Sequence, residues 1–107
     1  MTISDALYTY GIKDKKIDKL VNKMHKHKFI HNLYVVVSPI TGDGILEIYV
    51  YNQLLQPFYK EVIDKVRILG IARGKQDAYE LVLQMVQDMY DAGDGDDIDT
   101  EFFVREA

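Results

Sequence analysis

An apolar repeat at helical spacing between residues 75 and 91 sets the strongest limit on how this chain can fold. Side chains three and four positions apart share one face of an α-helix. The residues that follow this spacing are Ala78, Leu81, Val82, Met85, Val86 and Met89. The positions between them include acids and glutamines, and Gly93 and Gly95 end the repeat. An amphipathic helix from about Lys75 to Asp91 needs an apolar surface to cover.

Segments rich in β-branched and aromatic residues predict the strands that supply this surface. They are Leu33–Val37, Ile45–Tyr51 and Val66–Ala72. A loop containing Pro39 and Gly42 joins the first two as a β-hairpin. Pro57 suits a first helical turn, so a short helix is expected from Pro57 to about Ile63.

The amino-terminal part of the chain is expected to be helical. Ser4 is a candidate N-cap for a short helical turn that stops at Gly11. A longer helix follows from about Asp14 to His27. Its apolar stripe consists of Ile17, Leu20, Val21 and Met24.

The elements therefore follow the order α-β-β-(α)-β-α, which predicts an α+β fold in one domain, residues 1–107. We expect a two-layer sandwich, in which helices cover one face of a small, mainly antiparallel, three-stranded sheet. Residues 1–30 would form a basic helical head, residues 31–91 the core, and residues 92–107 an acidic tail.

The composition excludes several classes of protein. Apolar residues make up 48% of the chain and charged residues 28%, which excludes wholesale disorder. The lack of cysteine excludes disulfides and thiolate metal sites. No apolar run approaches the roughly 20 residues of a membrane helix, and residues 1–5 do not begin a signal peptide. We therefore expect a cytoplasmic protein without a membrane partner.

The net charge of −4 hides an uneven distribution. Residues 1–30 hold seven lysines against three aspartates, whereas residues 91–107 hold seven acids against one arginine. A basic head and an acidic tail either attract separate partners or attract each other.

The basic head is a candidate nucleic-acid interface, with Lys16, Lys19 and Lys23 as contact residues. The order helix–Gly–helix in residues 1–27 resembles part of a helix-turn-helix. The overall negative charge argues against this function, because nucleic-acid-binding domains usually present a net basic face. Nucleic acid is therefore the alternative partner rather than the first.

Arg73, Gly74 and Lys75 form a candidate site for a small anion, because they join a strand to a helix N-terminus. The surrounding sequence fits neither a Walker A loop nor a dinucleotide-binding fingerprint. The alternative is an ordinary strand–helix turn with two solvated cations.

No metal site, cofactor or enzymatic activity is predicted. His25 and His27 point to different sides of a helix, and the acids of residues 91–101 match no register of an EF-hand loop. Ser4 and Ser38 lie outside any nucleophile motif.

The tyrosines are the other notable feature. Tyr49 and Tyr51 alternate on one strand, and with Arg67 they are expected on the open face of the sheet. Half-exposed tyrosines are favoured at protein interfaces, although they equally pad small cores. Together with the acidic tail they form the candidate partner-binding set, completed by Asp94, Asp96 and Asp97. The predicted function is therefore a non-enzymatic protein-interaction or regulatory module, with a homodimer as one form.

Residues 46–103 also carry a resemblance to a known family. The segments concerned are 54–60 (LLQPFYK), 68–74 (ILGIARG), 77–82 (DAYELV) and 88–91 (DMYD). Together they resemble a small uncharacterised protein family of Gram-positive bacteria and their mobile elements. The resemblance implies a bacterial cytoplasmic setting and no particular activity, so it assigns no site residues. The basic head lies outside it.

Overall fold

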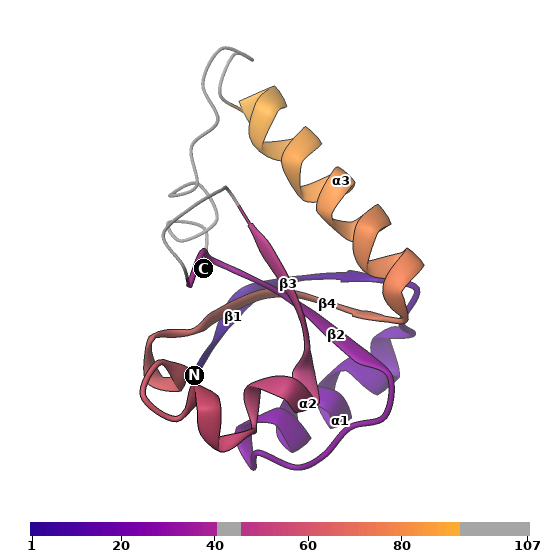
Figure 1. The fold of residues 1–107 in the computed structure, drawn as a ribbon. Coiled ribbons are helices and arrows are strands. Elements are labelled where there is room, and N and C mark those ends of the chain that lie inside the picture. The colour runs from indigo at the N-terminus through magenta and orange to yellow at the C-terminus, as the bar shows by residue number, and fades with distance from the viewer. Residues whose placement is uncertain (41–45, 93–107) are drawn as a thin grey trace.

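The computed structural model describes residues 1–40 and 46–92 of the chain. Its centre is a four-stranded sheet made of β1 (Thr2–Tyr10), β2 (Leu33–Val37), β3 (Glu47–Val50) and β4 (Arg67–Arg73). The strands lie in the order β1-β4-β2-β3 (Figure 1). β1 runs parallel to β4, whereas β2 runs antiparallel to both of its neighbours. The sheet is therefore mixed.

Helices cover both faces of this sheet (Figure 1). They are α1 (Asp14–His25), α2 (Tyr51–Leu54) and α3 (Lys75–Ala92), with 3₁₀ turns η1 (Pro57–Tyr59) and η2 (Ile63–Lys65). α1 and α2 share one apolar core with Leu33, Val35 and Ile71 of the sheet. α3 packs on the opposite face through Leu81 and Met85. The α+β class is confirmed, and the layers number three rather than the two expected.

The predictions for α1, α3, β2 and β4 agree with the structure to within two residues at each end. The expected helical turn in the first ten residues is wrong, because β1 forms a parallel pair with β4 there. We call the apolar cluster beneath α1 and α2 the α1 core, and the cluster beneath α3 the α3 core. Ile3 and Leu7 pack against the α1 core, while Tyr8 packs against the α3 core. The pairing shifts register between Ile3 and Tyr8, where the Ala6 N–H donates to the Ser4 hydroxyl (3.1 Å). The strand is therefore held at its two ends by β4.

The expectation that one face of the sheet is open to solvent is also wrong. Every residue of β4 from Ile68 to Ala72 is buried, as in a central strand covered on both sides. Gly70 lets α3 approach the strand closely, because a Cβ there would lie 2.9 Å from the Leu81 Cδ2. The close packing of α3 against β4 thus depends on the absence of a side chain at Gly70.

The second predicted strand is shorter than expected. β3 begins at Glu47 and ends at Val50, and Tyr51 is the first residue of α2. Pro57 starts the 3₁₀ turn η1 instead of a longer helix. Across the described parts of the chain, no helix is both long and apolar enough to cross a membrane.

Candidate functional site

A line of lysines runs along one side of α1. Lys13 immediately precedes the helix, and Lys16, Lys19 and Lys23 follow at intervals of three and four positions. Such positions share one helix face, and all of these side chains are exposed. With a rise of 1.5 Å per residue, the line is about 15 Å long.

Arg73, the last residue of β4, lies beside this line. Two shallow hollows, of about 240 Å³ and 180 Å³, share Lys16, Leu20 and Arg73 in their walls. Lys13 lines the first hollow, and Lys19 and Lys23 line the second. We call Lys13, Lys16, Lys19, Lys23 and Arg73 the basic face.

A turn of the backbone at Gly11 helps to bring these residues together. Gly11 has a φ of 70°, which favours glycine, and it reverses the chain between β1 and α1. A Cβ at Gly11 would lie 2.5 Å from the Asp77 Oδ2 in the first turn of α3. Tyr10 pairs with Ala72, so the turn into α1 lies close to Arg73 at the end of β4.

The charges of α1 are separated between its two sides. Among the described residues, no aspartate or glutamate lines either hollow of the basic face. Asp18 instead lines a separate hollow with Asp5, His25 and residues of β1. A phosphate or carboxylate approaching the basic face therefore meets cations without a carboxylate in the same hollow.

The predicted anion site at Arg73, Gly74 and Lys75 is divided by the structure. Arg73 belongs to the basic face. The Gly74 N–H donates to the Asn32 carbonyl oxygen (3.1 Å), so this donor is already in use. The Lys75 ammonium lies over the Tyr79 ring, 5.8 Å from its centroid. The three residues do not converge on one ligand position.

Tyr51 does not lie on a surface. It is fully buried in the α1 core, and its hydroxyl donates a long hydrogen bond (3.4 Å) to the Met24 carbonyl oxygen. Burial raises the pKa of the Tyr51 hydroxyl above its ordinary value. A buried side chain cannot contact a partner directly, so the expected placement of Tyr51 on an open face is corrected.

Tyr49 is half-buried on β3 and belongs to an aromatic cluster instead of an open sheet face. Its ring lies edge-on to Tyr59, with centroids 6.0 Å apart, and Tyr59 lies edge-on to Phe58 at 5.0 Å. The Tyr49 hydroxyl donates to the Glu47 Oε1 (3.2 Å). Partial burial, and then the Glu47 carboxylate, raise the pKa of Tyr49. Arg67 is exposed at the start of β4 and is separated from β3 by β2.

The remaining candidates divide into two groups. Asp94, Asp96 and Asp97 lie outside the described residues. His25, His27 and His31 are described, and no group of three His, Asp or Glu side chains within residues 1–40 and 46–92 is arranged to hold a metal ion.

Comparisons with protein-family models, with curated proteins and with solved structures found no match. The resemblance noted for residues 46–103 therefore stays a prediction. The geometry of the site is the basis for a functional proposal.

Sequence reasoning found three of the five residues of the basic face. It missed Lys13, although the spacing 13, 16, 19 and 23 already marks one side of a helix. It assigned Arg73 to a different site, because only the path of the chain between α1 and β4 places it beside the lysines.

Proposed function

We propose that this protein is a small binding module, not an enzyme, and that its basic face binds the phosphate backbone of a nucleic acid. The observation that supports this most directly is the placement of Arg73 beside Lys16, Lys19 and Lys23. Five cations from two elements form one surface, in place of separate solvated side chains.

The spacing of the cations favours a nucleic acid over a single small anion. Neighbouring lysines of the basic face are about 4.5 to 6 Å apart along the helix axis. A line of about 15 Å corresponds to roughly four steps of a nucleic-acid strand at 3.4 Å per step. A small anion would instead need donors that converge on one point.

Phosphate contacts position a protein on nucleic acid but carry no sequence information. The hollows of the basic face are lined by Lys, Arg, Gly and aliphatic side chains, and no aromatic side chain among the described residues lines them for base stacking. We therefore propose binding that depends on charge and has little sequence preference.

Fluorescence anisotropy with a labelled 20-base-pair duplex and a labelled 20-nucleotide single strand tests this function. Changing Lys16, Lys19 and Lys23 to Glu should abolish binding, and Lys65→Glu serves as the control because it reverses an exposed lysine outside the basic face. Equal affinity of the triple variant and the control would contradict the proposal. Wild-type protein that binds neither probe at low salt would contradict it as well.

A second function, contact with another protein, is favoured by one observation. Phe58 is 85% exposed and stacks edge-on against Tyr59, which extends the aromatic cluster to the surface. Exposed aromatic side chains are enriched where proteins bind one another. Phe58→Ala should remove a partner that wild-type protein captures from its native host. Phe29→Ala is the matched control, because the Phe29 side chain is 77% exposed and lies outside the aromatic cluster. Equal capture of the partner by both variants would contradict this function.

A further inference from the structure

A second concave site lies apart from the basic face. It is a cavity of about 420 Å³ between the end of α1 and the segment that runs from α2 to η2. None of its lining residues lines the hollows of the basic face. Its volume falls within the range of small-molecule sites in proteins, about 300 to 1,000 Å³.

The wall of this cavity is mainly apolar. Leu54 is anchored in the α1 core with only 1% of its surface exposed. Leu55 and Ile63 are half-buried and pack against the same core, and Pro57 completes the wall. A ligand that enters would therefore place an apolar body against fixed aliphatic side chains.

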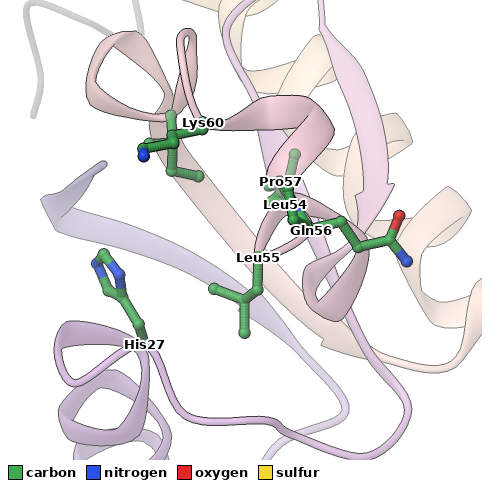
Figure 2. A pocket seen from close by; sticks show the side chains of 7 residues that line it. His27, Leu54, Leu55, Gln56, Pro57 and Lys60 are labelled. Carbon is green, nitrogen blue, oxygen red and sulfur yellow. The ribbon is translucent and has the colours of Figure 1, made fainter.

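Each polar side chain of the cavity, on His27, Gln56 and Lys60, carries a hydrogen-bond donor. His27 and Lys60 lie on the same side of Leu55, one above the other, whereas the Gln56 amide points away from them (Figure 2). Lys60 carries an ammonium group, and the imidazole of His27 can donate a hydrogen bond. Among the described residues no Asp or Glu lines the cavity. The two groups thus suit a negatively charged group on the ligand.

The backbone fixes His27 at this position. His27 has a φ of 53° and follows the last turn of α1, where glycine is the usual residue. The His27 N–H donates to the Met24 carbonyl oxygen and the Lys28 N–H to the Lys23 carbonyl oxygen, both at 3.0 Å. Only backbone atoms make this helix end, so the imidazole itself is not needed to form it.

The opposite wall is tied to the same segment. The Asn52 side chain in α2 accepts the Ile30 N–H (2.8 Å) and donates to the Ile30 carbonyl oxygen (2.7 Å). The chain after His27 is thereby attached to the helix that precedes Leu55. These hydrogen bonds join the two segments that supply the walls of the cavity.

From this geometry we infer that the cavity binds a small organic anion, with the apolar body of the ligand on Leu54, Leu55 and Ile63 and its carboxylate between His27 and Lys60. The inference is independent of nucleic-acid binding, since the two sites share no lining residue.

Two-dimensional NMR with 2-naphthoate as the probe and 2-naphthylmethanol as its uncharged analogue tests the inference. Naphthoate should shift the backbone amides of His27, Leu55 and Lys60. Naphthylmethanol should bind about tenfold more weakly, because it lacks the hydrogen bonds to a charged group. Equal affinity for the two probes would overturn the inference. The absence of naphthoate shifts at about 5 mM, above the millimolar dissociation constants of weak ligands, would also overturn it.

Substitutions test whether His27 and Lys60 bind the carboxylate of the ligand. His27→Gly and Lys60→Met should each weaken naphthoate binding several-fold and leave naphthylmethanol unchanged, whereas Lys65→Met should alter neither. A thermal melt of each variant establishes that it is folded. Naphthoate affinity that is unchanged in both His27→Gly and Lys60→Met would overturn the inference.

Discussion

Arg73 and Lys16 line the same two hollows, although they lie far apart in the sequence. Arg73 is the last residue of β4 and Lys16 lies near the start of α1, and the strands β2 and β3 come between them along the chain. Their proximity joins a lysine stripe and a strand end into one surface. The five cations of the basic face line these two hollows.

Lys13 and Lys15 provide a matched pair for mapping this surface. Both are exposed at the start of α1, but only Lys13 lines a hollow of the basic face. Lys13→Gln should weaken binding to a duplex several-fold at low salt, because one phosphate contact is lost. Lys15→Gln should change it much less. Equal losses in an anisotropy titration would show that total charge, not this face, sets the affinity.

Gly70→Ala is expected to destabilise the fold. The added Cβ would lie 2.9 Å from the Leu81 Cδ2 and 3.3 Å from both the Met85 Sδ and the Tyr8 Cβ. Overpacking of this kind costs about 1 to 3 kcal/mol in the free energy of unfolding. Urea denaturation measures the loss. A variant as stable as the wild type would contradict the close packing of α3 on β4.

His27→Gly is expected to stabilise the fold. A non-glycine residue in the left-handed region costs about 1 to 2 kcal/mol. Glycine also stabilises the unfolded chain through its entropy by about 0.4 to 1 kcal/mol, so the net gain lies between about 0 and 1.6 kcal/mol. The same denaturation experiment decides it. A less stable variant would show that the imidazole supports the fold, contrary to a helix end made by backbone atoms alone.

Tyr51 should make stability depend on alkaline pH. Its pKa is raised by burial, so above pH of about 10 the hydroxyl ionises in the unfolded chain before it does so in the folded one. The stability that Tyr51 contributes is fully present below that pH and is lost as the pH rises. Tyr51→Phe should therefore be slightly less stable than the wild type at pH of about 8, with the gap narrowing or reversing at pH of about 11. A gap that does not change with pH would contradict this.

Local sequence patterns predicted the elements whose periodicity is long and regular. α3 and α1 carry apolar residues at helical spacing, and β2 is a short β-branched run, so each is specified by its own residues. β1 was missed because Ser4 and Asp5 interrupt any strand pattern there. Pairing with β4, which is remote in sequence, is what makes the segment a strand.

The burial of both sheet faces had a local signal. The run from Ile68 to Ala72 is apolar without alternation, which is typical of a strand covered on both sides. The burial of Tyr51 had no local signal. The alternating pattern of β3 continues through Tyr51 in the sequence, but the chain turns into α2 after Val50. Its position in the core follows from that turn.

The candidate site was predictable only in part for the same physical reason. Spacing alone identifies the lysine stripe of α1. The contribution of Arg73 depends on where β4 ends relative to α1, and the cavity at His27 depends on the contact of Asn52 with Ile30. Both are tertiary contacts between segments that no local pattern relates.

The salt dependence of duplex binding by wild-type protein and by Arg73→Gln tests the central claim most directly. Each phosphate contact contributes about −0.9 to the slope of log K against log salt concentration. If the basic face is one surface, Arg73→Gln and Lys16→Gln should each reduce the magnitude of the slope by about 1. A slope that falls for Lys16→Gln and stays at the wild-type value for Arg73→Gln would contradict the account.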